Sequence, residues 1–255
     1  MNQTSKNRPL EGKVALLTGA VRRNGLAAAF ALSGDGAAIV INTRQSVDEG
    51  KAAIAAIQKQ GGKALLVKAD ITNEKQVTAM FDKAVDKFGG LDILVNNAAE
   101  RTVIPFLETS YADWKRFAHT VIDGAFLCSR AALPHMIAAG WGSIVNVGSV
   151  GNYIGQAERA HLGAAKGGLA GMTRSMAREF AARHIQVNCV APGVIGGQRS
   201  IAQGPPVAGD LLARIPVGRK GYCEEVGEAV RWLCQPSQSF ITGMTIHVNG
   251  GEYMP

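Results

Sequence analysis

Glycine and arginine residues near the N-terminus are of the types that bind a phosphate-bearing ligand. The stretch Lys13–Gly19 ends an apolar run, and Gly25 begins an alanine-rich run, so a tight turn separates a predicted strand from a predicted helix. Backbone amides at the start of a helix attract anions, and such a turn can cradle a pyrophosphate. Glycines mark any strand-to-helix turn, so the assignment depends on the residues about twenty positions later.

The end of the second predicted strand distinguishes the two nicotinamide dinucleotides. Proteins that bind NAD(H) usually place Asp or Glu there, against the ribose 2′-hydroxyl. This sequence has Asn42-Thr43-Arg44, and Arg22 and Arg23 lie in the first turn. Guanidinium groups pair well with phosphate, so we predict NADP(H) rather than NAD(H) as the cofactor. The alternative is three surface arginines without a ligand.

Strands and helices must position this turn, and the sequence indicates them by short apolar runs that alternate with longer amphipathic stretches. This pattern predicts an α/β fold, a single doubly wound Rossmann-type domain whose seven-stranded parallel sheet carries helices on both faces. The predicted strands are Val14–Leu17, Ala38–Asn42, Ala64–Lys68, Ile93–Asn96, Gly142–Val147, Gln186–Val190 and Thr245–Val248. The predicted helices lie near residues 25–34, 46–60, 74–88, 112–139, 163–183 and 224–235.

The 255 residues suffice for one large domain. We expect a flexible N-terminal tail over residues 1–9 and a single oxidoreductase domain over 10–255. Residues 193–211 form a long irregular stretch rich in Gly and Pro, which we interpret as a substrate-covering flap, with disorder as the alternative. The segment Glu100–Leu107 is the other expected wall of the substrate pocket.

Composition narrows the classes of partner. The formal charge is +7, but the Lys and Arg residues form neither a long run nor a nucleic-acid-binding motif, so we expect no nucleic-acid partner. The four cysteines are widely spaced, which predicts buried free thiols and no metal site. The polar N-terminus lacks a signal-peptide core and no long apolar segment is present, so we expect no membrane association and a cytoplasmic protein.

Several motifs, in order from about Leu10 to Gly251, resemble those of the short-chain dehydrogenase/reductase family. Thr18–Gly25 is similar to the family's TGxxxGxG turn, with Arg at the middle glycine position as in pteridine reductases. Asn96–Ala99 resembles the NNAG segment with Ala replacing Gly, and Pro192–Ile195 resembles PGxIxT, whose backbone holds the nicotinamide carboxamide. Gly197 stands at the usual Thr. The residues and the resemblance together imply a cofactor site made of Gly19, Val21, Arg22, Arg23, Asn24, Gly25, Leu26, Arg44, Asp70, Ile71, Asn97, Ala98, Lys166, Pro192, Gly193 and Ile195.

The same resemblance implies a catalytic Ser, a Tyr thirteen residues later, a Lys four further and an Asn on the preceding long helix. Ser149 and Lys166 occupy their positions, whereas Leu162 occupies the Tyr position and Val121 the Asn position. In the family the Tyr hydroxyl, with its pKa lowered by the Lys ammonium, exchanges the proton that accompanies hydride transfer at a carbonyl. Leucine cannot do so, and losing one positioned proton donor typically lowers the rate by about 10²–10⁴.

Replacement proton carriers are available between Ser149 and Leu162. Tyr153, Glu158 and His161 can all carry protons, and we retain Tyr153 and His161 as candidate catalytic residues beside Ser149 and Lys166. On a helix His161 would point about 100° away from the Tyr position. Asp123, two positions from the Asn position, would face elsewhere.

Three functions remain open from the sequence. The favoured one is an NADPH-dependent reductase that transfers hydride to a C=N or an activated C=C bond of a small organic substrate, because such bonds need little help with a proton. The second is a carbonyl reductase or alcohol dehydrogenase whose acid has moved to Tyr153 or His161, and the third is a non-redox NADP-binding protein. The C-terminal segment Phe240–Gly251 resembles the family's last strand, often found at a tetramer interface, and implies a homotetramer or homodimer.

Overall fold

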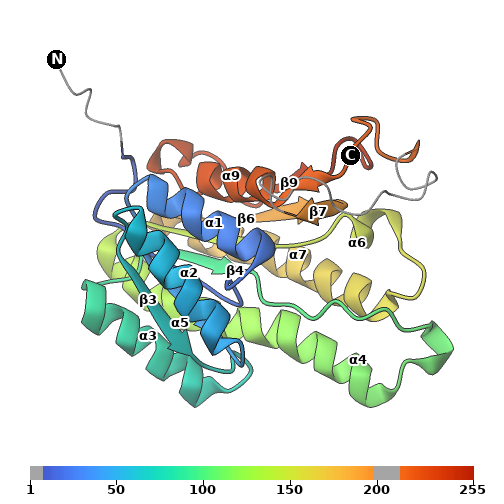
Figure 1. Cartoon of the computed structure of the whole chain (residues 1–255), viewed down its shortest axis with the longest axis horizontal. Coiled ribbons are helices and arrows are strands. Elements are labelled where there is room, and N and C mark those ends of the chain that lie inside the picture. Colours follow the sequence, from blue (N-terminus) through green and yellow to red (C-terminus); the bar gives the residue numbers. More distant parts are fainter. Residues whose placement is uncertain (1–7, 198–212) are drawn as a thin grey trace.

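Seven parallel strands form one sheet in the order β3-β2-β1-β4-β5-β6-β9 (Figure 1). The computed structural model describes residues 8–197 and 213–255. The strands are β1 (Val14–Leu17), β2 (Ala38–Thr43), β3 (Ala64–Lys68), β4 (Ile93–Asn96), β5 (Gly142–Val147), β6 (Ile185–Pro192) and β9 (Thr245–Val248). The strand order reverses between β1 and β4, and open α/β sheets bind ligands in the crevice at the carboxyl ends of the strands at such a point.

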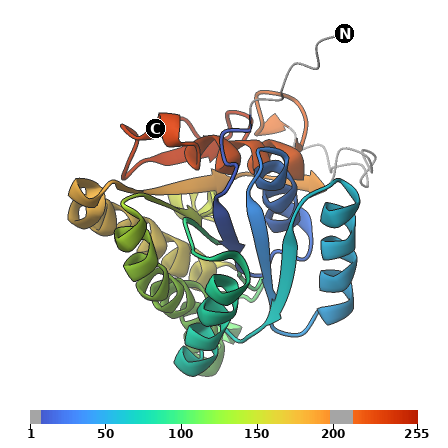
Figure 2. The same cartoon turned by 90° about the vertical axis from the view of Figure 1, so that its left-hand side faces the viewer.

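Helices cover both faces of the sheet, as Figure 2 shows. One layer holds α1 (Arg23–Gly34), α2 (Val47–Lys59) and α9 (Cys223–Leu233). The other holds α3 (Glu74–Phe88), α4 (Tyr111–Ala118), α5 (Gly124–Ala139) and α7 (Ala160–Phe180). Shorter elements connect them: η1 (Phe106–Glu108), η2 (His119–Asp123), α6 (Gly151–Ile154), η3 (Ala181–Arg183), η5 (Pro236–Gln238), β7 (Ile195–Gly197) and β8 (Gly221–Tyr222).

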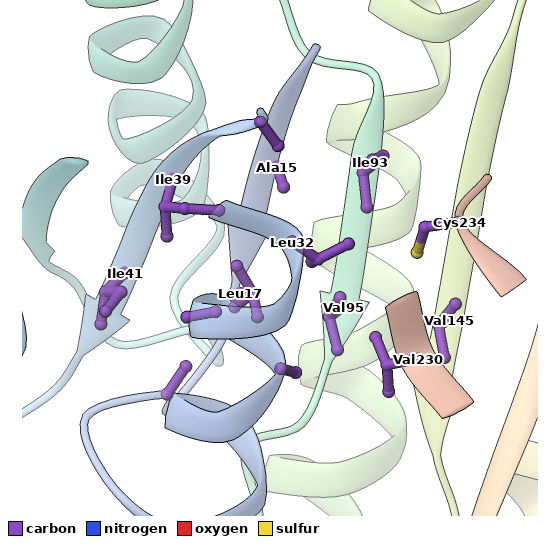
Figure 3. Packing of buried hydrophobic residues seen from close by; sticks show 14 of the residues in the cluster. Ala15, Leu17, Leu32, Ile39, Ile41, Ile93, Val95, Val145, Val230 and Cys234 are labelled. Carbon is purple, nitrogen blue, oxygen red and sulfur yellow. The ribbon is translucent and has the colours of Figure 1, made fainter. Parts of the chain in front are cut away.

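The two faces of each strand enter different cores, because successive side chains of a strand point to opposite sides. Ala15 and Leu17 of β1 pack with Leu32 of α1 and Val230 of α9 (Figure 3). Val14 and Leu16, which alternate with them along β1, belong to the core beneath α3 and α5. Strands that are buried on both faces carry continuous apolar runs, and the predicted α/β fold with its seven-stranded parallel sheet is confirmed.

Several element boundaries differ by a few residues from those predicted, and three differences bear on the site. The helix expected over 112–139 is interrupted by a π-turn, η2, centred on Val121. The segment around His161, which the sequence left as helix or loop, belongs to α7. The predicted flap begins with an ordered strand, β7, which pairs with β8, so its first residues are not irregular.

Residues 198–211 of the predicted flap and residues 1–7 of the predicted tail lie outside the described residues. At the end of that tail, Arg8 forms an ion pair with Glu11, 3.1 Å away. All four cysteines are buried free thiols, as predicted. Over the residues that the structure describes, no helix combines the length and apolar character that crossing a membrane requires.

Candidate active site

Two adjoining cavities lie at the carboxyl edge of the sheet. The turn cavity, about 520 Å³, is lined by the turn between β1 and α1 and by the segments that follow β2 and β3. The Lys166 cavity, about 550 Å³, is lined by α7 and by the segments that follow β5 and β6. They share a wall formed by Asn24, Asn97, Ala99, Glu100 and Arg101. Together they can hold a dinucleotide and a small substrate side by side.

Close backbone packing shapes the turn between β1 and α1. Gly19 has φ +58°, and a Cβ there would lie 3.0 Å from the Cα of Ala98. A Cβ on Gly25 would lie 2.7 Å from the Cα of Ala20 and 2.6 Å from Nδ2 of Asn97. The side-chain amide of Asn97 donates to the carbonyls of Thr18 and Gly19. Glycine is therefore required at Gly25, because a side chain there would clash with Ala20 and with Asn97, which binds the turn to the end of β4.

Polar groups around the turn suit a phosphate-bearing ligand. The Oδ1 atom of Asn24 is buried without a hydrogen-bond partner among the described residues, and Asn24 lines both cavities. Arg22, Arg23 and Arg44 all line the turn cavity. Orphaned polar atoms and guanidinium groups around one cavity fit a dinucleotide that carries an additional phosphate.

Each of these arginines also has a protein partner. Arg22 forms an exposed ion pair with Glu49 at 3.1 Å, and Arg44 lies 3.9 Å from Asp70 and from Glu100. Such exposed pairs contribute little to stability, so a phosphate can replace the carboxylates at low energetic cost. Arg23 has φ +52° and donates to the carbonyl of Ile195 at 3.0 Å, which joins the turn to β7.

Polar side chains at the end of β2 and after β3 make defined hydrogen bonds. The Oδ1 atom of Asn42 accepts from the amide of Gly19, and its amide group donates to Ala69, so Asn42 supports the turn. Asp70 accepts hydrogen bonds from the amide and hydroxyl of Thr72. Burial alone would raise the pKa of Asp70, but these bonds and the Arg44 charge outweigh it and lower that pKa. Asp70 is therefore an anionic acceptor at the cavity wall.

The predicted cofactor residues divide between the two cavities. Lys166, Pro192, Gly193 and Ile195 line the Lys166 cavity. Gly25 and Leu26 line neither and lie behind the turn. The turn cavity is lined by Gly19, Val21, Arg22, Arg23, Asn24, Arg44, Asp70, Ile71, Asn97 and Ala98.

Ser149 and Lys166 lie together in the Lys166 cavity. The Ser149 hydroxyl oxygen accepts from the amide of Gly151 at 3.1 Å, which leaves its proton free for another acceptor. The Lys166 ammonium is 4% exposed and donates to the carbonyl of Val147. Burial, with a smaller contribution from Arg101, lowers the pKa of Lys166 to about 8. This pair can orient a polar substrate atom and place positive charge beside it.

Apolar side chains occupy the two positions where the resemblance implies Tyr and Asn. Leu162 lines the Lys166 cavity one helical turn before Lys166. Val121, at the π-turn, is 2% exposed and packs with Ala125, Ala165 and Leu169. Neither side chain carries an exchangeable hydrogen, so neither can take part in the proton relay that the resemblance implies at these positions.

The candidate replacement acids are directed away from the cavity. The Tyr153 hydroxyl donates to the Thr245 hydroxyl at 3.1 Å, and its ring stacks on Tyr253. Nε2 of His161 lies 3.1 Å from the carbonyl of Thr102, which requires the hydrogen on Nε2, and its ring packs on Phe117. Neither Tyr153 nor His161 lines the Lys166 cavity.

Glu158 and Asp123, which are not among the retained catalytic candidates, have other surroundings. Glu158 is exposed, with φ +60°, and does not line that cavity either. Asp123 is exposed and lies 2.7 Å from Nδ1 of His119, so it faces solvent as its spacing predicts.

Arginine side chains at the Lys166 cavity were missed by the sequence reasoning. Arg101, Arg159 and Arg214 contribute to its lining. Arg101 lies in the segment 100–107 that was expected to line the pocket, and Arg159 lies three residues before Leu162. The available signal was the presence of basic residues in both segments expected near the reacting centre.

A doubly wound parallel sheet with a glycine turn at its switch point and a Ser–Lys pair beside it defines a nicotinamide-dependent oxidoreductase. A family model described as enoyl-(acyl carrier protein) reductase matches residues 19–252. The chain belongs to the short-chain dehydrogenase/reductase family.

Two curated proteins are similar to this chain over nearly its whole length. Cis-4-hydroxycyclohexanecarboxylate dehydrogenase of Sinomonas cyclohexanicum is 41% identical over 241 residues, covering 94% of this chain and 96% of the relative. The 3-oxoacyl-(acyl-carrier-protein) reductase FabG of Vibrio cholerae is 41% identical over 245 residues, covering 96% and 99%.

A solved structure has the same fold. A double mutant of a Serratia marcescens short-chain dehydrogenase/reductase superposes with a TM-score of 0.88 at 33% identity, covering 96% of this chain and 99% of that one. The protein is thus an oxidoreductase. Its homotetrameric or homodimeric assembly and its cytoplasmic location stay predictions.

Proposed function

We propose that this protein is an NADPH-dependent reductase that acts on a C=N or an activated C=C bond of a small organic substrate. When bound, the reduced nicotinamide supplies hydride to the substrate. Leu162 carries the proposal, because it presents an apolar wall in the Lys166 cavity where a proton-donating hydroxyl would be needed for a ketone. Tyr153 and His161 do not line that cavity and so do not replace it.

The remaining polar groups suit a substrate that needs charge stabilisation more than a proton. The Lys166 ammonium uses one of its three hydrogens on the Val147 carbonyl and keeps the others for a developing anion. A conjugated C=C delocalises negative charge onto an oxygen that Lys166 and Ser149 can stabilise. An iminium substrate is already cationic and needs no proton. The description of the matching family model, an enoyl reductase, is in keeping with C=C reduction.

The preference for NADP(H) rests on the turn cavity. Asn42 and Thr43 at the end of β2 and the following Arg44 provide no carboxylate, while Arg22, Arg23 and Arg44 line that cavity. An adenosine 2′-phosphate provides the acceptor oxygens that these guanidinium groups match. A 2′-hydroxyl would leave them with only their exposed protein partners.

A second candidate is carbonyl reduction or alcohol oxidation, which the names of the curated relatives favour. One relative is a dehydrogenase of a hydroxycyclohexanecarboxylate and another is a 3-oxoacyl reductase. In this chain the proton would have to come from Lys166, whose pKa of about 8 permits exchange near neutral pH. Lys166 would then replace Tyr153 and His161 as the relocated acid.

The experiment compares matched six-membered rings. Purified protein with NADPH is offered 2-cyclohexenone, cyclohexanone and the cyclic imine 2,3,4,5-tetrahydropyridine, and the loss of nicotinamide absorbance and the products are measured. We expect kcat/KM for the enone or the imine to exceed that for the ketone by at least about 10²-fold, the contribution of a positioned acid. Equal or faster turnover of the ketone would overturn the proposal in favour of the second candidate.

A further inference from the structure

Two arginines lie on separate segments that meet at the Lys166 cavity. Arg101 follows β4, and Arg159 immediately precedes α7. Both line the cavity, and Arg159 lines it without reaching the turn cavity. Within residues 8–197 and 213–255, neither guanidinium has a carboxylate partner at ion-pair distance. Arg101 is exposed and Arg159 is half-buried, so both guanidinium groups are accessible to a ligand in the cavity and have no carboxylate partner in the described chain.

Hydrogen bonds hold the two segments together next to these arginines. The amide of Ile104 donates to the carbonyl of Glu158 at 2.9 Å. Nε2 of His161 donates to the carbonyl of Thr102 at 3.1 Å, and the His161 ring packs on Phe117 with centroids 4.0 Å apart. Each bond lies within three residues of both arginines, so the fold fixes them as neighbours. His161 is therefore a positioning residue for this wall.

The charges that line the cavity do not balance. Its ionisable lining residues in the described chain are Glu100, Arg101, Arg159, Lys166 and Arg214. Glu100 is paired with Arg116 at 3.0 Å, and Arg214 with Glu252 at 2.7 Å. Arg101, Arg159 and Lys166 have no carboxylate counter-ion among the residues that the structure describes.

The pKa of Arg101 reflects the excess of positive charge around this cavity. Arg101 is exposed, and partial desolvation together with repulsion from Arg23, Arg159 and Arg22 lowers its pKa. Like charges disfavour each other's charged form, so an anion placed between these groups relieves the repulsion.

We propose that Arg101 and Arg159 bind an anionic oxygen group of the substrate, a carboxylate or a phosphate monoester, at a distance from the bond that is reduced. Guanidinium forks recognise both groups with paired hydrogen bonds. Arg159 lines the Lys166 cavity and not the turn cavity, so we assign its ligand to the substrate and not to a cofactor phosphate at the turn. The placement of the reacting bond beside Lys166 rests on the proposed function, whereas the anion site does not.

A binding experiment tests the site without turnover. Protein saturated with NADP⁺ is titrated calorimetrically with 4-oxocyclohexanecarboxylate, its methyl ester, and the phosphate monoester of 4-(hydroxymethyl)cyclohexanone. We expect at least one anion to bind 10-fold or more tightly than the ester, and the tighter anion identifies the group. Equal affinity of the ester and both anions would overturn the proposal.

Variants assign the effect to the two arginines. Arg159→Gln and Arg101→Gln should each weaken anion binding by about 10- to 100-fold, the range for a lost charge-assisted hydrogen bond, while the affinity for the ester stays constant. Arg159→Lys, which keeps the charge, should recover part of the loss. Arg183→Gln is the matched control, because Arg183 is exposed in η3 at the start of β6, the opposite edge of the sheet.

Further measurements separate the possible failures. Arg159→Gln should keep the wild-type affinity for NADPH by fluorescence titration and the wild-type melting temperature. Unchanged anion affinity in Arg159→Gln would overturn the assignment. Anion binding that depends on Arg159, with no enone or imine turnover, would contradict the proposed function and leave the anion site standing. Enone turnover with no preference for the anions over the ester would support the proposed function and overturn the anion site.

Discussion

Replacing Leu162 by Tyr tests whether one missing hydroxyl limits the chemistry of this site. Leu162 is 8% exposed in the wall of the Lys166 cavity, one helical turn before the Lys166 ammonium. A phenol at this position would lie beside a buried cation, which lowers the phenol pKa toward the working range of the enzyme. We expect Leu162→Tyr to create a ketone reductase.

The expected gain follows from the value of a positioned acid, about 10²–10⁴ in rate. Val121 is buried among Ala125, Ala165 and Leu169 and cannot complete the relay, so the lower limit applies. A 10²-fold rise in kcat/KM corresponds to about 2.7 kcal/mol of transition-state stabilisation. Initial rates with cyclohexanone and NADPH measure it directly.

Leu162→Phe is the matched control because it has the same ring without the hydroxyl. Both variants must first show the wild-type NADPH affinity, since a distorted α7 would affect the two alike. The gain should appear in Leu162→Tyr alone, and enone or imine reduction should change little. Equal ketone rates in the two variants would refute the reasoning that proton donation is what the wild-type site lacks.

Three further predictions concern the cofactor turn and the buried lysine. Arg44→Ala should weaken NADPH binding about 10- to 100-fold by removing a charge-assisted contact, with NADH affinity nearly constant in fluorescence titrations; equal losses for both would contradict the 2′-phosphate assignment. Gly25→Ala should destabilise the protein by about 1–3 kcal/mol in chemical unfolding, because its Cβ would lie 2.7 Å from the Cα of Ala20. In the control Gly171→Ala the Cβ meets nothing within 4 Å, and a helical Ala should stabilise by about 0.5–1 kcal/mol; a loss in both variants would contradict the packing argument. Lys166 has its pKa lowered from 10.5 to about 8, so unfolding takes up a proton between these values and stability rises with pH there. The unfolding free energy of the cofactor-free wild type relative to Lys166→Met should therefore increase by up to about 3 kcal/mol from pH 8 to pH 10.5, at about 1.36 kcal/mol per pKa unit; a constant difference would show that the ammonium is not buried.

The sheet was predictable from sequence because its central strands are buried on both faces. Val14–Leu17 is apolar throughout, Gly142–Val147 is mostly apolar and fully buried, and the structure gives both the predicted bounds. The glycine turn between β1 and α1 was predictable for a related reason, since the close approach of Gly25 to Ala20 leaves no room for a side chain. Local sequence encodes both features.

The wall of the Lys166 cavity depends on contacts between distant segments and could not be predicted in the same way. His161 and Thr102 are 59 residues apart in sequence, and the bond between them gives His161 a positioning role. Tyr153 is held against Thr245, 92 residues away. Both residues have the chemistry of an acid, but only the folded chain determines that they face away from the cavity.

The distribution of polarity around the Lys166 cavity links the proposed chemistry to the proposed specificity. Near the position of proton transfer, the chain has the apolar Leu162 and Val121 where the family's relay has polar groups. In the segments that flank Leu162, it has Arg101 and Arg159 without counter-ions in the described chain. Under the proposed function, substrate selection relies on the anion that these arginines bind, and reduction relies on the charge of Lys166. The two tasks are therefore separable: Leu162→Tyr should change which bond is reduced without changing the anion preference, and Arg159→Gln should do the opposite.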